Sequence, residues 1–204
     1  MAKLLNVEVK KIYLYPLGGI SKFFLPLNSS FLKEFIILIS GPLSQEIAKI
    51  FLILILPNNT EIVLMYHYGI LIFNLLPIYP LDGGKLTHLI LSIFLPYRQS
   101  FKLAIFISYI IIALYLILNI TVLKINNISI IIFLIYKVYS EQNKINYLYE
   151  KFILERYLNN YNYKSSKLIT STKNFYRNKR HLLFLNDKYY LEKDYLYKKY
   201  KKNE

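Results

Sequence analysis

The sequence predicts an all-α polytopic membrane protein with about four transmembrane helices, an N-terminal β-hairpin and a basic cytoplasmic tail. Its 204 residues are 55% hydrophobic, with a mean hydropathy of +0.32, and nevertheless carry a formal net charge of +14. A soluble domain rarely combines these properties. The apolar and the basic residues are also segregated along the chain. Apolar runs fill residues 31–139, whereas fifteen of the 26 Lys and Arg residues lie in 141–204. The chain therefore divides into residues 1–30, a transmembrane core at 31–139 and a tail at 140–204.

Residues 1–30 are predicted to form a β-hairpin or a membrane-associated loop. The segment at 7–27, VEVKKIYLYPLGGISKFFLPL, is alternating, β-branched and aromatic in its first half and then turns at PLGG. As a hairpin it would offer an edge to which an extended peptide could add. A connecting loop with a turn fits the same pattern. The first residues, MAKLLNVEVKK, have too short an apolar stretch for a signal peptide and no small-residue cleavage site.

Four stretches of the core come close to the roughly 20 apolar residues that a membrane-spanning helix needs. The candidate spans lie at about 32–56, 61–79, 103–119 and 121–139. Lys124, Asn126 and Asn127 shorten the apolar run of the fourth. Basic residues precede the first span, follow the second and crowd the tail, whereas the loop at 57–61 has none. Because basic residues are retained on the cytoplasmic side, both termini of the chain are predicted to be cytoplasmic.

A polar stretch, NLLPIYPLDGGK at 74–85, interrupts this apolar core. Unsatisfied backbone groups cost several kcal/mol in hydrocarbon, so its prolines and glycines are tolerated only beside protein or a water-filled cavity. A carboxylate at membrane depth costs roughly 2.5 to 3.5 kcal/mol on insertion scales, and it marks a functional site or has a cationic partner. Asp82 therefore needs a metal, a transported ion or a neighbouring lysine such as Lys85.

The residues around Asp82 suit a site in such a cavity. Gly83 and Gly84 would let backbone approach a ligand or another helix closely. Asn74 could hold an unwound backbone or a polarised carbonyl through its amide. A broken helix beside an intramembrane acid also fits a small cation transporter. The sequence shows no second, corresponding broken helix, because the other irregularity, Gly41-Pro42, is of a different kind.

NLLPIYPLDGGK resembles the third-ligand motif of the site-2 proteases, the intramembrane zinc metalloproteases of the peptidase M50 type, and in particular of their sporulation-type branch. YPLGG at 15–19 looks like the family's hairpin, SGPLSQ at 40–45 like the Gly-Pro of its next span, and FILERY at 152–157 like the segment past its last span. The resemblance covers residues 1 to about 160. It implies a metalloendopeptidase of the bacterial cell membrane that uses zinc to cleave a membrane-associated protein substrate.

The resemblance also assigns roles to single residues. In the family, two histidines of a His-Glu-x-x-His helix and one aspartate hold the zinc, and the glutamate is the general base. By the resemblance, Asp82 is the carboxylate ligand of the zinc ion. Asn74 matches the asparagine that contacts the substrate backbone or the oxyanion. Pro77 and Pro80 are expected to keep the peptide between them extended.

The sequence departs from the family at its histidines and has no cysteine. Its three histidines are His67, His88 and His181, and no two are four residues apart, so no His-Glu-x-x-His is present. We interpret His67 as packed or interfacial, His88 as occupying an ordinarily apolar position, and His181 as solvated. The register suggests that Met1 is an internal methionine of a longer protein whose first two spans are absent. The alternative is a non-catalytic member that keeps the cavity as a binding or regulatory module.

The tail at 140–204 is predicted to be a small helical or partly disordered appendage. Its interleaved Lys and Tyr residues could bind nucleic acid. In a membrane protein, however, basic residues more simply lie against anionic lipid, each contributing about 1 kcal/mol. The expected partners are therefore the lipid bilayer and a membrane-associated protein substrate, with no nucleic acid. An inhibitory membrane protein that plugs the cavity is a further partner that the resemblance allows.

Overall fold

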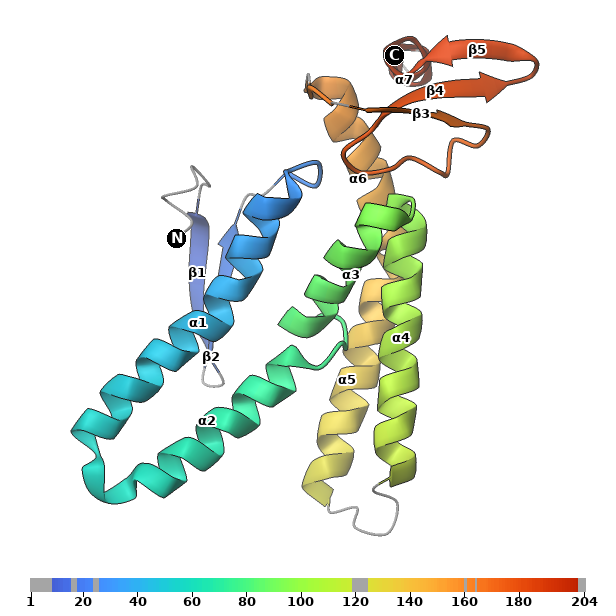
Figure 1. The fold of residues 1–204 in the computed structure, drawn as a ribbon. Coiled ribbons are helices and arrows are strands. Elements are labelled where there is room, and N and C mark those ends of the chain that lie inside the picture. Colours follow the sequence, from blue (N-terminus) through green and yellow to red (C-terminus); the bar gives the residue numbers. More distant parts are fainter. Residues whose placement is uncertain are drawn as a thin grey trace. The chain divides into compact units, whose positions relative to one another are not determined.

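A computed structural model describes residues 9–15, 18–23, 26–118, 125–159, 161–163 and 165–201 (Figure 1). The chain divides into two compact units, Met1–Phe73 and Asn74–Glu204. Three features of the sequence prediction lie outside the described residues: Met1, the Pro16-Leu17 part of the predicted turn, and the start of the fourth predicted span at 121–124.

The first unit contains a hairpin and two helices. Strands β1 (Val9–Tyr15) and β2 (Gly18–Phe23) pair antiparallel, in the segment whose alternation predicted a hairpin. Helix α1 (Phe31–Ile55) has Pro42 in its interior, and the short 3-10 turn η2 (Pro57–Asn59) connects it to α2 (Thr60–Leu75).

A polar cluster links α1 to α2. Glu46 Oε1 lies 2.8 Å from His67 Nε2, and Glu46 Oε2 lies 2.5 Å from Lys49 Nζ. Gln45 Nε2 also donates to the backbone oxygen of His67 at 3.3 Å. His67 is buried, as its interpretation as a packed histidine requires.

The second unit begins at the end of α2 and contains the remaining elements. Its helices are α3 (Asp82–Phe94), α4 (Tyr97–Leu118), α5 (Ile125–Asn143), α6 (Ile145–Leu158) and α7 (Glu192–Lys201), and its strands are β3 (Ser166–Ile169), β4 (Arg180–Leu185) and β5 (Lys188–Leu191). Helix α4 packs against α3, α5 and α6. The buried apolar side chains of these helices include Leu89, Phe101, Ala104, Ile105, Leu134, Val138 and Phe152.

Among the described residues, two helices, α1 and α4, are long and apolar enough to cross a membrane, with mean hydropathies of 1.6 and 2.5. They correspond to the first and third predicted spans. The four-span prediction is not confirmed for the other two. Helix α2 has 16 residues, fewer than the roughly 20 that a span requires. Helix α5 has 19 residues, but Lys137 and Glu141 lie in its second half and lower its hydropathy.

The tail contains a small sheet that the sequence did not predict. In the order β3-β4-β5, β3 is parallel to β4 and β4 is antiparallel to β5. Along β4 the side chains alternate, so that His181 and Leu183 are buried while Arg180 and Leu182 are exposed. Short strands in a sequence rich in Lys and Tyr have little apolar pattern of their own. Contacts of β4 and β5 with α7 stabilise the sheet. The tail is therefore a mixed α/β structure over its described residues.

Candidate functional site

The break between α2 and α3 is a tight turn. Ile78 N–H donates to Leu76 O at 2.7 Å, and Leu81 N–H donates to Ile78 O at 2.8 Å. The Tyr79-Pro80 peptide bond is cis. The two hydrogen bonds of the turn correct the expectation that the peptide between Pro77 and Pro80 is extended. The hydrogen bonds reverse the chain there, and Ile78 is buried.

Gly83 and Gly84 allow the first turn of α3 to lie directly against the backbone of the break. A Cβ atom on Gly83 would overlap the carbonyl groups of Leu75 and Leu76. A Cβ atom on Gly84 would overlap the carbonyl of Ile78 and the backbone nitrogen of Tyr79. The predicted close approach is therefore confirmed, and its partner is the turn itself.

Helix α4 satisfies a backbone group that the break leaves free. Tyr79 N–H donates to Ser108 Oγ at 2.8 Å, and Ser108 Oγ in turn donates to Ala104 O at 2.8 Å. The Tyr79 and Phe101 rings also pack together, with centroids 4.9 Å apart. Because an unsatisfied amide in an apolar environment costs several kcal/mol, Ser108 is the residue of α4 that stabilises the broken backbone.

Replacing Ser108 with alanine is expected to lower the free energy of unfolding by about 1–3 kcal/mol, because the Tyr79 amide loses its hydrogen bond to the Ser108 hydroxyl. Ser100→Ala is the matched control. Ser100 is equally buried, but its hydroxyl donates to Tyr97 O within its own helix. Thermal unfolding in detergent compares the two variants. Equal losses in both would contradict the assigned role of Ser108.

Asp82 is the first residue of α3. Its Oδ1 lies 3.3 Å from Lys85 Nζ, and the side chains of Asp82 and Lys85 are 35% and 43% exposed. Such an exposed ion pair contributes at most about 1 kcal/mol. The lysine partner considered from the sequence is therefore present, but the pair is not a dry helix contact. The Asp82 carboxylate stays accessible to a second cation.

Asn74 lies in the last turn of α2, on the other side of the break from Asp82 in the chain. Its side chain is half-buried. The two residues singled out from the sequence thus flank one short turn. Their roles toward a metal or a substrate stay predictions.

Among the residues that the structure describes, no three His, Asp or Glu side chains gather closely enough to hold a metal ion. His88 is buried against the rings of Tyr97 and Phe101, with centroids 5.4 and 4.7 Å away. Its Nε2 has no hydrogen-bond partner within the described part of the chain. The interpretation of His181 as solvated is wrong, because this residue is fully buried.

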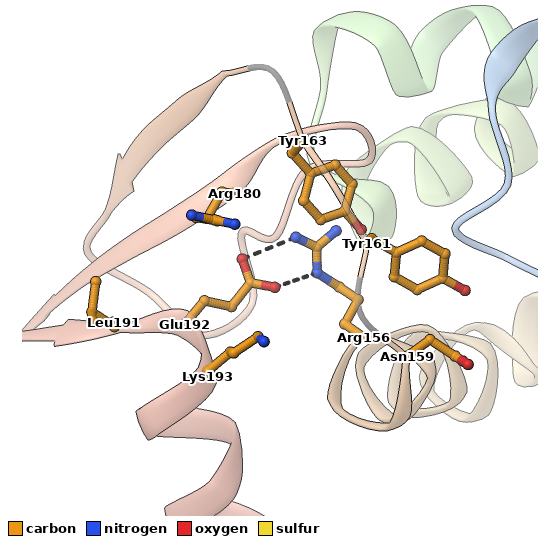
Figure 2. A pocket seen from close by; sticks show the side chains of 8 residues that line it. All are labelled: Arg156, Asn159, Tyr161, Tyr163, Arg180, Leu191, Glu192 and Lys193. Carbon is orange, nitrogen blue, oxygen red and sulfur yellow. Dashed lines mark hydrogen bonds and ion pairs between the residues drawn. The ribbon is translucent and has the colours of Figure 1, made fainter.

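The tail has a buried ion pair that sequence reasoning missed. Arg156, in α6, donates from Nε to Glu192 Oε1 at 2.6 Å and from Nη2 to Glu192 Oε2 at 2.9 Å (Figure 2). Arg156 Nη2 also donates to Lys179 O at 2.6 Å. Arg156 and Glu192 are only 5% and 7% exposed. The pair joins α6 to the first residue of α7.

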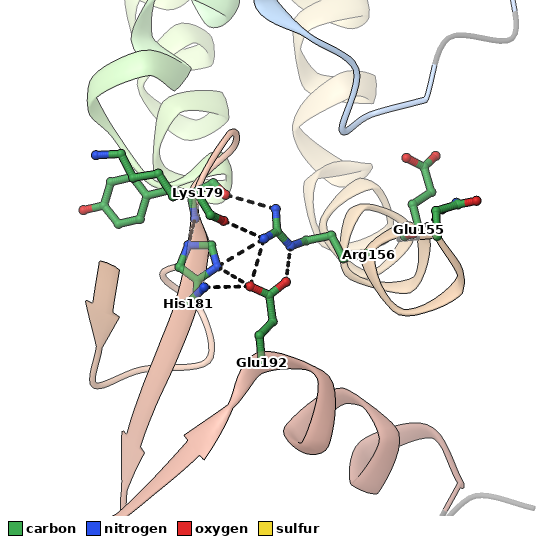
Figure 3. A network of polar contacts seen from close by, with 7 residues as sticks. Glu155, Arg156, Lys179, His181 and Glu192 are labelled. Carbon is green, nitrogen blue, oxygen red and sulfur yellow. Dashed lines mark hydrogen bonds and ion pairs between the residues drawn. The ribbon is translucent and has the colours of Figure 1, made fainter. Parts of the chain in front are cut away.

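His181 completes this network (Figure 3). Its backbone N–H donates to Glu192 Oε2 at 2.8 Å, and its Nδ1 lies 2.9 Å from the same oxygen. Tyr176 N–H donates to His181 Nε2 at 2.9 Å. Because Nε2 accepts a hydrogen bond, the ring proton is on Nδ1 and points to Glu192, which makes the imidazole neutral.

Burial and hydrogen bonding shift two pKa values in the network. Burial lowers the pKa of His181, and the hydrogen bond to Glu192 opposes this change without reversing it. Burial alone would raise the pKa of Glu192, but the hydrogen bonds from His181 and Arg156 outweigh it and lower this pKa to about 2. At neutral pH the network therefore contains an ionised glutamate, a guanidinium and a neutral histidine.

Two curated proteins are similar to the chain. Stage IV sporulation protein FB of Bacillus subtilis is 31% identical over 165 residues, which cover 77% of this chain and 57% of that protein. A zinc metalloprotease of Methanocaldococcus jannaschii is 33% identical over 114 residues, which cover 51% of this chain and 32% of that protein. The chain thus spans about half of the first relative and a third of the second. No protein-family model matches the chain.

The fold and the break define a class: a mostly helical protein with helices of membrane-spanning length and a proline- and glycine-containing break that presents a carboxylate. Within this class, the chain belongs to the site-2 protease family, peptidase M50.

Proposed function

We propose that the chain is the part of an intramembrane zinc metalloendopeptidase that supplies the carboxylate ligand and the substrate-contacting amide. The observation that carries this proposal is the turn at 76–81, which ends on the accessible Asp82 and is fixed by contacts of Gly83, Gly84 and Ser108. A carboxylate that serves only in a structural ion pair does not require a turn that is fixed by such contacts. The family membership gives the carboxylate its chemistry.

The described residues supply one ligand for a zinc ion. Zinc in hydrolases takes three protein ligands and a water, and the bound water becomes acidic enough to act as a nucleophile near neutral pH. One carboxylate is not a complete site, so no hydrolytic step is derived from these residues alone. In the proposal, Asp82 offers its carboxylate to a site whose other ligands come from polypeptide outside these 204 residues.

Asn74 is proposed to hold the backbone of the substrate. Its amide can donate to a peptide carbonyl and accept from a peptide N–H, which matches an extended chain. The substrate is proposed to be a membrane-associated protein. The hairpin β1–β2 is a second place where such a chain could pair, because an edge strand presents free backbone groups.

The proposed location is a bilayer that contains α1, α2, α4 and α5. Large apolar side chains are exposed on all four helices, for example Leu54 at 72%, Ile72 at 62%, Leu118 at 79% and Phe133 at 56%. Exposed apolar surface of this extent is unfavourable in water and suited to hydrocarbon. In this location the break that follows the short helix α2 lies within the bilayer. Both termini are proposed to be cytoplasmic.

The zinc content of the protein made from its complete reading frame tests the proposal. The wild type is expected to hold about one zinc ion per molecule, and the Asp82→Asn variant to bind zinc much more weakly. The loss of zinc affinity should exceed the roughly 10- to 100-fold loss that follows removal of an outer-shell partner, because Asp82 is proposed as a direct ligand. Asp187→Asn is the matched control, because this aspartate is exposed in the β4–β5 turn. A metal-free wild type, or unchanged zinc in Asp82→Asn, would leave a non-catalytic binding protein or a cation transporter.

A further inference from the structure

The sheet of the tail has one covered face and one open face. Ile169, His181 and Leu183 are buried on the covered face, where α7 packs against β4 and β5. Successive side chains of a strand point to opposite faces, so the residues between them belong to the open face. The large side chains of the open face are Leu168 of β3, Arg180, Leu182 and Phe184 of β4, and Tyr189 and Leu191 of β5.

The open face is apolar. Leu182 pairs with Leu168 on one side and with Leu191 on the other, so the three leucines form a row across the sheet. They are 36%, 52% and 57% exposed. Beside this row, the rings of Phe184 and Tyr189 lie with centroids 4.9 Å apart. A sheet with one face in water normally carries polar side chains there. A contiguous exposed apolar patch therefore indicates an interaction surface.

The charge of the tail indicates which partner suits the open face. Arg180 is exposed and makes no ion pair among the described residues, and the open face has no acidic side chain. Residues 141–204 contain fifteen Lys and Arg against seven Asp and Glu. A second copy would bring together two surfaces of the same sign, which opposes association. An acidic partner is favoured for the same reason.

The distance of the sheet from the proposed bilayer disfavours lipid as the partner. Helix α6 follows α5 after Lys144, whose backbone stays in the α region at φ −83° and ψ −9° (Figure 1). Its 14 residues span about 21 Å at 1.5 Å per residue. The sheet meets α6 near its C-terminal end, where Arg156 contacts His181. The polar layer of a bilayer is only about 5–8 Å thick on each side. With α5 in the bilayer, as proposed above, the sheet lies beyond the headgroups.

We propose that the open face binds an amphipathic helix of a second protein, with acidic residues along the flanks of its apolar face. A helix already covers the opposite face of the sheet, where α7 lies, and helix-on-sheet layers are a common way to bury such a surface. The apolar face of the partner would pack on the row of Leu168, Leu182 and Leu191. An acidic side chain of its flank would pair with Arg180. The inference concerns the tail alone and does not depend on proteolysis.

Binding of a defined peptide to the full chain in phosphatidylcholine nanodiscs tests the proposal. The peptide has about 18 residues, roughly five helical turns, with leucines on one face, glutamates along the flanks and alanines elsewhere. Its fluorescence anisotropy is expected to show saturable binding to the wild type. A peptide of the same composition in scrambled order, and one with lysine in place of glutamate, should bind at least about tenfold more weakly.

Variants of the chain locate the binding surface. Leu191→Ser is expected to weaken binding of the acidic peptide about 5- to 10-fold, because about half of a leucine side chain is no longer buried by the partner. Arg180→Gln should weaken it about 2- to 5-fold and reduce its dependence on ionic strength. Leu158→Ser is the matched control, since this leucine is 68% exposed but lies in α6, and it should bind like the wild type. Unchanged melting temperatures show that the losses are not due to unfolding.

Four results would overturn the proposal. Equal binding of the acidic, basic and scrambled peptides would show that neither charge nor an apolar face is recognised. Equal binding by the Leu191 and Leu158 variants would place the peptide elsewhere. Displacement of the peptide by vesicles of phosphatidylserine and phosphatidylcholine would favour lipid as the partner. Dimerisation of the full chain that Leu191→Ser abolishes and Leu158→Ser preserves would favour a second copy.

Discussion

Replacing Gly84 with alanine is expected to destabilise the protein by more than the 1–3 kcal/mol that overpacking of a core typically costs. The added Cβ would overlap the carbonyl of Ile78 and the nitrogen of Tyr79, and neither backbone group can rotate away as a side chain would. The turn at 76–81 has to open before the methyl group fits. Loss of the Tyr79 hydrogen bond to Ser108 adds to the cost, because the two features share one backbone segment. Thermal unfolding in detergent measures the effect.

Gly69→Ala is the matched control for this substitution. Gly69 is also in a helix, α2, but a Cβ there meets no atom within 4 Å. Alanine at this position is expected to be neutral or stabilising by up to about 1 kcal/mol, since it favours a helix over glycine. If Gly84→Ala unfolds at the same temperature as Gly69→Ala, α3 does not lie against the turn as described.

Replacing Glu192 with glutamine is expected to lower the free energy of unfolding by about 3–5 kcal/mol, because it leaves Arg156 buried without a counter-charge. Glutamine keeps the shape of the side chain but offers one acceptor oxygen where the carboxylate offers two. Glu150→Gln removes an ion pair with Lys199 on the surface and is the control. It should cost less than about 1 kcal/mol, because exposed ion pairs are weak. Chemical denaturation monitored by circular dichroism compares both variants with the wild type.

The pH dependence identifies the charge as the cause of this loss. The pKa of Glu192 is about 2 in the folded protein against an ordinary 4.5, so its stabilising effect is complete above 4.5 and is lost as the pH falls toward 2. The lowered pKa of His181 acts in the same direction from an ordinary 6.5 downward, because the unfolded chain then binds the proton more readily. The stability difference between wild type and Glu192→Gln should therefore shrink below pH 4.5. A constant difference would show that packing and not charge sets the cost.

The site around the break could be predicted in large part from local residue types. Proline and glycine have restricted or permissive backbones wherever they occur, so the interruption and the close approach at Gly84 were both evident from the sequence. The reversal of the chain in the turn was not evident from the sequence, because an extended segment and a hydrogen-bonded reversal both satisfy the local preferences of the two prolines. Ser108 was missed for another reason. It is one serine in a long apolar helix, and its partner Tyr79 lies far away in the chain.

The tail was the least predictable part. Arg156 and Glu192 belong to ordinary charged stretches, and only the folded chain shows that their side chains meet. His181 follows three basic residues in the stretch RNKRH, which suggested solvent exposure. The alternation along β4 was the available signal, since His181 and Leu183 share a face there. A run of four to six residues is too short to distinguish a strand from an irregular segment by composition alone.

The start of α4 has a consequence for how the protein can be shortened. The first amide groups of a helix have no acceptor within it, and at Tyr97 the acceptor is the carbonyl of Phe175 in the tail, 2.9 Å away. The Tyr97 ring is also stacked on Phe152 of α6, with centroids 4.3 Å apart. A truncated version that stops after α6 would uncover the end of an apolar helix and remove its cap. A shortened version made for expression of the apolar helices should therefore retain the tail through residue 201.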